Sequence, residues 1–159
     1  MDKIKVSFLI LITITFTLFS FEISFAKSTN KKDFILMGNK AINMVKDNNS
    51  GLYSKKFSEL VIQIDKEFDV EKIKFKKKSL INYMGDILVY ICQGHKNIYQ
   101  NSDMKIIIEK CKRANNYYEK NNLYIGNRAD YKSFIHNILG QMYAWQYYID
   151  GDKKNYKNA

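Results

Sequence analysis

The sequence predicts an all-α protein, a small antiparallel bundle of about five helices. The 159 residues include no proline and only seven glycines, a composition that favours helices joined by short polar loops. Apolar residues recur at helical spacing in five separate stretches. The only strand-like alternation is short and has no evident partner, so no sheet is expected.

Residues 1–26 have the pattern of a secretory signal peptide. Lys3 and Lys5 precede an uncharged apolar run over residues 6–21, and Ser24 and Ala26 place small residues where signal peptidase cleaves. The run has 16 residues, whereas a helix that spans a bilayer needs about 20. Cleavage after Ala26 is therefore expected; the alternative is an uncleaved membrane anchor.

Cleavage leaves residues 27–159 as a single helical domain, a length that suits one hydrophobic core. Lys27 rather than a cysteine follows the cleavage point, which does not suit a lipoprotein. A bacterial protein with this signal is expected in the periplasm or secreted from the cell.

The first two helices are expected at about 31–46 and 55–68. Asn30 can cap the first, and Asp33 lies in its first turn, where a carboxylate is favourable. The polar segment 47–51 separates the two helices. Apolar side chains line one face of each helix, namely Phe34, Met37, Ala41, Met44 and Val45 in the first and Phe57, Leu60, Val61, Ile64 and Phe68 in the second.

A basic cluster follows, and we expect it to form a linker or the first turns of the third helix. It interleaves apolar Ile73 and Phe75 with lysines. Such a run could hold an anionic polymer or an acidic protein surface; the alternative is an ordinary solvated loop. The lysines are Lys72, Lys74, Lys76, Lys77 and Lys78.

The third and fourth helices are expected at about 77–99 and 103–120, with Asn101 or Ser102 at the turn between them. Gly94 is a weak helix former and could end the third helix early. The fourth helix is followed by a loop over 121–126.

The fifth helix, at about 128–150, has the clearest boundary signals. Asn127 can cap it, with Asp130 in the first turn, and Gly151 follows as a stop. Its side chains are apolar most of the way round, which indicates a central helix or one at an interface. The tail 152–159 is expected to fray.

The two cysteines predict a disulfide between the third and fourth helices. Cys92 and Cys111 are equally distant from the turn at Asn101 and Ser102, so an antiparallel hairpin brings them level. An exported protein meets an oxidising compartment, which favours the bond. If Gly94 ended the third helix, the pairing would need a long loop to fold back.

Three alternatives for the cysteines are weaker. Zinc would need Cys92, His95, Cys111 and His136 together, at a spacing that matches no familiar zinc pattern. A nucleophilic pair of Cys92 and His95 requires a free thiol, and both cysteines could also remain unpaired. With the disulfide formed, His95 is expected to be a bystander near the seam.

The sequence contains no catalytic motif, so an enzyme is not favoured and no catalytic residue, cofactor or metal is predicted. His136 is expected to be a partly buried, hydrogen-bonded structural residue. A carboxylate pair for sugar hydrolysis has no local signature, so it stays open for Glu59, Asp65, Glu67 and Asp86.

Aromatic side chains form a second candidate surface. Tyrosine and tryptophan are enriched at protein interfaces because a large apolar body carries a polar tip. The alternative is packing in and around the core, and a homodimer is also open. The residues are Tyr117, Tyr118, Tyr124, Trp145, Tyr147 and Tyr148.

The formal net charge of +10 favours an anionic partner, although a lysine-rich genome would produce the same balance. The first hypothesis is a stoichiometric binding protein, of the inhibitor or immunity type, for an acidic protein. The alternatives are a small hydrolase of cell wall or polysaccharide, and a binder of anionic envelope polymers or surfaces. Export makes nucleic acid an unexpected partner.

Overall fold

Five α-helices and two short 3-10 helices make up the part of the chain that the computed structural model describes, which is residues 27–47, 49–98 and 103–150. This confirms the predicted all-α bundle. The elements are α2 (Lys31–Asp47), η1 (Asn49–Tyr53), α3 (Lys55–Glu67), α4 (Lys78–Asn97), α5 (Met104–Asn121), η3 (Gly126–Arg128) and α6 (Asp130–Asp150). The predicted signal peptide, the cap at Asn101 or Ser102, the stop at Gly151 and the tail 152–159 lie outside these residues.

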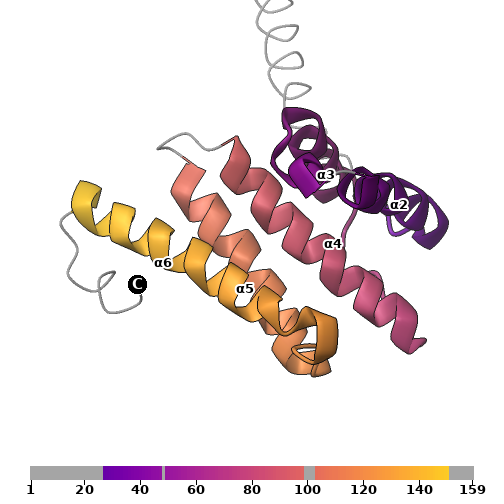
Figure 1. The fold of residues 1–159 in the computed structure, drawn as a ribbon. Coiled ribbons are helices and arrows are strands. Elements are labelled where there is room, and N and C mark those ends of the chain that lie inside the picture. The colour runs from indigo at the N-terminus through magenta and orange to yellow at the C-terminus, as the bar shows by residue number, and fades with distance from the viewer. Residues whose placement is uncertain (1–26, 48, 99–102, 151–159) are drawn as a thin grey trace, which may run out of the picture.

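Helix α4 is the centre of the bundle. It lies antiparallel to α5 on one side and packs against α3 on the other, while α2 packs on α3 and α6 runs along α5 (Figure 1). Among the described helices, none combines the length and the hydropathy that a membrane crossing requires. The core between these helices is aliphatic and aromatic, and its fully buried members include Phe34, Phe57, Ile64, Ile87, Ile91, Ile107, Tyr118 and Ile135.

Side-chain caps set the starts of α2 and α3, where Asn30 and Ser54 accept backbone hydrogen bonds. The Asn30 side-chain oxygen accepts hydrogen bonds from the backbone N–H groups of Lys32 (3.0 Å) and Asp33 (3.4 Å), as predicted. The prediction for α6 was wrong at its first turn. Gly126, with φ +55°, begins a 3-10 turn, and α6 starts at Asp130 instead of being capped by Asn127.

The chain between α3 and α4 is a linker, residues 68–77, and α4 begins only at Lys78. Its apolar residues Val70 and Ile73 are buried against the bundle, whereas its lysines are exposed. Within the described residues the strand-like alternation makes no sheet. The linker begins with one isolated bridge to the N-terminal segment, in which the Ser28 N–H donates to the Glu67 carbonyl at 2.7 Å.

Gly94 does not end the third predicted helix, which continues as α4 to Asn97. A Cβ at Gly94 would lie 2.1 Å from Val61 Cγ2 and 3.4 Å from the Ser58 carbonyl oxygen. The missing side chain therefore lets α3 approach α4 closely. Asn97, near the end of α4, also holds α4 against η1 and α3. Its Nδ2 donates to the Leu52 carbonyl (2.8 Å) and to Ser58 Oγ (3.0 Å).

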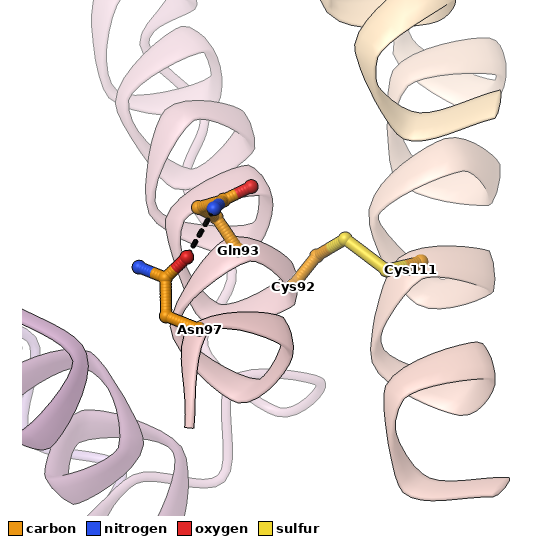
Figure 2. The surroundings of a disulfide bond; sticks show 4 residues. All are labelled: Cys92, Gln93, Asn97 and Cys111. Atoms are coloured by element: carbon orange, nitrogen blue, oxygen red, sulfur yellow. Dashed lines mark hydrogen bonds between the residues drawn. A yellow bond between two sulfur atoms is a disulfide. The ribbon is translucent and has the colours of Figure 1, made fainter. Parts of the chain in front are cut away.

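Cys92 and Cys111 form the predicted disulfide, which joins α4 to α5 with a Cα–Cα distance of 4.8 Å. Figure 2 shows the two side chains pointing toward each other across the seam, while Gln93 and Asn97 lie on another face of α4. Both cysteines are fully buried. The uninterrupted α4 is what keeps Cys92 level with Cys111.

We predict that Gly94→Ala lowers the free energy of unfolding by about 1–3 kcal/mol, because the new methyl group overpacks the contact between α3 and α4. Urea unfolding followed by circular dichroism measures the loss. Adding Val61→Ala to Gly94→Ala should cost less than the sum of the single changes, since the neighbour that clashes is shortened. Strict additivity of the two changes would contradict the close approach.

We also predict that reducing the disulfide lowers the free energy of unfolding by about 3 kcal/mol, the loop-closure value for a loop of this length. Urea unfolding with and without a phosphine reductant tests this. The double variant Cys92→Ser, Cys111→Ser is the control, and its unfolding should no longer respond to the reductant. A wild-type midpoint that the reductant leaves unchanged would disprove the stabilising role.

Candidate ligand-binding groove

A groove of about 540 Å³ opens between linker 68–77, α4 and α5, and we call it the basic-rimmed groove. Its volume falls in the range of protein ligand sites. Apolar and aromatic side chains form one part of the lining, namely Val70, Ile73, Phe75, Ile81, Leu88 and Tyr117. Charged and polar side chains form the rest, namely Glu71, Lys74, Glu109, Lys112, Arg113, Asn116, Lys120 and Asn121.

The sequence pattern explains the two walls. In the linker, the alternation of apolar and basic residues turns Ile73 inward and leaves Lys74 exposed. The other wall is one face of α5, where lining residues recur every three or four positions from Glu109 to Asn121. At 1.5 Å per residue this wall is about 18 Å long.

The groove lining has an excess of positive charge, with Lys74, Lys112, Arg113 and Lys120 against Glu71 and Glu109. The Lys112 ammonium lies 5.3 Å from the centre of the Tyr143 ring, a cation–π contact that leaves its charge in place. Lys74 Nζ donates to the Glu71 backbone carbonyl at 2.5 Å. Across the described residues, neither Lys112 nor Lys120 lies within 4.0 Å of a carboxylate oxygen.

Tyr117 joins the apolar floor to the α5 wall. Its hydroxyl donates to the Ile81 carbonyl at 3.3 Å, and it remains partly exposed in the groove. Burial raises the pKa of Tyr117 to about 12, so the phenol stays neutral at physiological pH. It therefore offers a ligand an aromatic face without negative charge.

Arg113 links the groove to a buried ionic centre, which we call the Asp65 cluster (Asp65, His95, Lys110 and Arg113). One Asp65 oxygen accepts from Arg113 at 2.5 Å; the other lies 3.2 Å from Lys110 Nζ and 3.3 Å from His95 Nε2. The Asp65 side chain is only 6% exposed. Since these residues come from α3, α4 and α5, a single carboxylate fixes three helices.

Burial alone would raise the pKa of Asp65, because it disfavours the charged form. The hydrogen bond from His95 and the positive charges of Arg113 and Lys110 outweigh burial, and they hold the pKa of Asp65 well below its ordinary value. Asp65 is thus ionised at any physiological pH. The expectation that His95 is a bystander at the disulfide seam was wrong, since it is a partner of this carboxylate.

A second carboxylate, Asp86, ties α4 to η3, the 3-10 turn just before α6. It accepts two hydrogen bonds from Arg128, at 2.8 and 2.7 Å, and one from the Tyr118 hydroxyl at 3.0 Å. Tyr118 is fully buried and stacks against Tyr124, with 4.9 Å between ring centres. Its assignment to a partner surface was therefore wrong, because the seam between α4, α5 and α6 encloses it.

The structure brings some members of the two predicted surfaces together and separates others. Lys74 and Tyr117 meet in the basic-rimmed groove. Lys72 pairs with Asp69 at 2.9 Å, and Lys76, Lys77 and Lys78 are exposed along the linker and the start of α4. The aromatic residues of α6, which are Trp145, Tyr147 and Tyr148, lie outside the groove lining, with Trp145 52% and Tyr148 82% exposed.

The cysteines and His136, which were considered for metal binding or catalysis, make structural contacts instead. The disulfide joins both sulfur atoms, so neither is a thiolate that could bind zinc or attack a substrate. Residues 27–47, 49–98 and 103–150 hold no group of three or more His, Cys, Asp or Glu side chains suited to a metal ion. His136 is exposed, not partly buried as expected, and its Nε2 lies 3.2 Å from Asn115 Oδ1.

The carboxylates that were left open for hydrolysis show no acid–base pair. Glu59 lies 3.8 Å from Lys55, and Glu67 accepts from Gln63 at 2.7 Å, both on the surface. A general acid needs a raised pKa, and the pKa of Asp65 is shifted the other way.

The basic residues of α5 were not predicted as part of a site, although Lys112, Arg113 and Lys120 line the groove beside Lys74. Lys110, Lys112 and Arg113 lie within four consecutive residues, but Glu109 precedes them and Glu119 precedes Lys120, which lowers the net charge of the stretch. A helical projection of α5 could have placed Arg113 and Lys120 on one face with Tyr117. That the linker lies opposite this face could not be predicted from the sequence, because the tertiary structure brings the two segments together.

We predict that Asp65→Asn lowers the free energy of unfolding by about 3–5 kcal/mol at pH 7, because it leaves Lys110 and Arg113 as buried charges without a counterion. Glu59→Gln, which removes an exposed pair, should cost less than about 1 kcal/mol.

The effect of Asp65 should also depend on pH. A carboxyl group whose pKa is lowered by folding stabilises the protein above its unfolded pKa of about 3.9, and this contribution is lost as pH falls toward the folded value. The difference between wild type and Asp65→Asn in urea unfolding should therefore be constant from pH 7 to about 5 and shrink below about pH 4. A difference that persists at acid pH would contradict the ionic account.

The sequence matches no protein-family model, and neither a curated protein nor a solved structure shows significant similarity to this chain.

Proposed function

We propose that this protein is an exported, stoichiometric binding protein that holds an acidic protein partner in the basic-rimmed groove. One observation carries the proposal: a groove with an apolar floor is bordered by Lys74, Lys112 and Lys120, which have no carboxylate partner among the described residues and outnumber the lining carboxylates Glu71 and Glu109. A partner with carboxylates around an apolar anchor complements both features.

The two features would play different physical roles. Apolar contacts with Phe75, Ile81 and Tyr117 would supply affinity, at roughly 25 cal/mol for each Å² removed from water. The lysines at the rim would accelerate encounter and reject basic proteins, and their effect would weaken with salt. The net charge of +10 acts in the same direction over longer distances.

The apolar floor favours a protein partner over a purely anionic polymer. A polymer bound only through its charges would need the exposed lysines of the linker and no groove. Hydrolysis has no comparable support, since Asp65 and Asp86 both serve as counterions for cations from other parts of the chain.

The test is site-specific photocrosslinking in an extract of the envelope of the source cell. A benzoylphenylalanine at the exposed Asn116, in the groove rim, should capture one dominant acidic protein, whereas the same group at the exposed Gln141 on α6 should not. The double charge reversal Lys112→Glu, Lys120→Glu should reduce capture at position 116 by about tenfold or more, the factor expected when about 1.4 kcal/mol of binding is lost.

Lys40→Glu, Lys56→Glu is the matched control. It changes the net charge equally, but these exposed lysines lie on α2 and α3, outside the groove lining. Crosslinking of the acidic protein at position 116 should be unchanged in this control. Equal loss in both charge reversals would show that only overall charge matters, and capture from Gln141 alone would place the partner elsewhere.

A further inference from the structure

We infer that the element of the partner that enters the basic-rimmed groove is an acidic amphipathic α-helix. This inference rests on the proposed function and specifies the shape of the partner. It follows from the spacing of two sets of residues, one on the floor of the groove and one on its rim.

The apolar floor repeats with the period of two helical turns. Ile81 and Leu88 of α4 both line the groove and are seven residues apart, which is about 10.5 Å along the helix axis. Residues i and i+7 of a docked helix have the same separation on one face. In an extended strand, side chains of one face recur about every 6.8 Å, so they would match one floor residue and miss the other.

The positive rim has nearly the same period. Lys112 and Lys120 are eight residues apart on α5, or about 12 Å along its axis. Carboxylates two turns apart on the flank of a docked helix would therefore face both lysines. Two separated cations suit a ligand with several carboxylates better than an alkyl chain with a single anionic head.

The surroundings of the groove also suit a helix. Two of its sides are the helices α4 and α5. Among the described residues the third side is the non-helical linker, so no third helix borders the groove. A helix that lies in an apolar groove between helices is a recurrent mode of peptide recognition. The α5 wall of about 18 Å would accommodate about 12 helical residues.

The experiment measures binding of the full chain to three probes by fluorescence anisotropy or competition. The first is a lactam-constrained peptide of about 15 residues, long enough for three to four turns, with leucines at i, i+4 and i+7 and glutamates on both flanks. The second is its diastereomer with two central D-residues, which has the same composition and charge but cannot form the helix. The third is dodecanoate.

The helical peptide should bind at least about tenfold more tightly than the diastereomer. Lys112→Glu, Lys120→Glu should weaken its binding by about tenfold or more, whereas Lys40→Glu, Lys56→Glu should leave the dissociation constant within about twofold of wild type. Circular dichroism of each variant checks that the bundle remains folded.

Equal binding of the two peptides would overturn the helical inference, and so would binding of dodecanoate alone. Failure of both peptides while Asn116 still crosslinks to an acidic protein would also overturn the inference but leave the proposed function standing. Loss of the groove-specific crosslink itself would remove the proposed function together with the inference.

Discussion

The bundle depends on one buried carboxylate. Asp65, near the end of α3, is held by Arg113 and Lys110 from α5 and by His95 from α4. A buried charge is tolerated only when its partners replace the lost water, so the three helices are constrained to the one arrangement that provides them. The same constraint orients Arg113 in the groove wall and fixes the point where the linker leaves α3.

The disulfide and Gly94 act on the same arrangement from neighbouring positions of α4. The disulfide fixes the register of α4 against α5, and Gly94 sets how closely α3 approaches α4. These contacts lie on different faces of one helix, as Figure 2 shows for Cys92 and the adjacent Gln93. The linker passes beside α4 and α5 without filling the space between them, and this space is the basic-rimmed groove.

Five cations of α5 and η3 play two different roles. Lys110 and Arg113 form ion pairs with Asp65, and Arg128 forms an ion pair with Asp86. Lys112 and Lys120 have no such carboxylate within the described residues, and both line the groove. This division, rather than the net charge, is what supports an acidic partner at a particular place on the surface.

The sequence alone determined the helical class, the five helices to within two or three residues at each end, and the pairing of Cys92 with Cys111, because apolar periodicity, capping and cysteine register are local properties. It also marked Lys74 and Tyr117, but it misplaced Tyr118 and His95. Only the tertiary structure decided the partners of Asp65 and Asp86 and brought the linker opposite α5, since those contacts join residues 30 or more positions apart. Local patterns do not encode which face of one helix meets a distant segment; packing and the pairing of buried charges decide it.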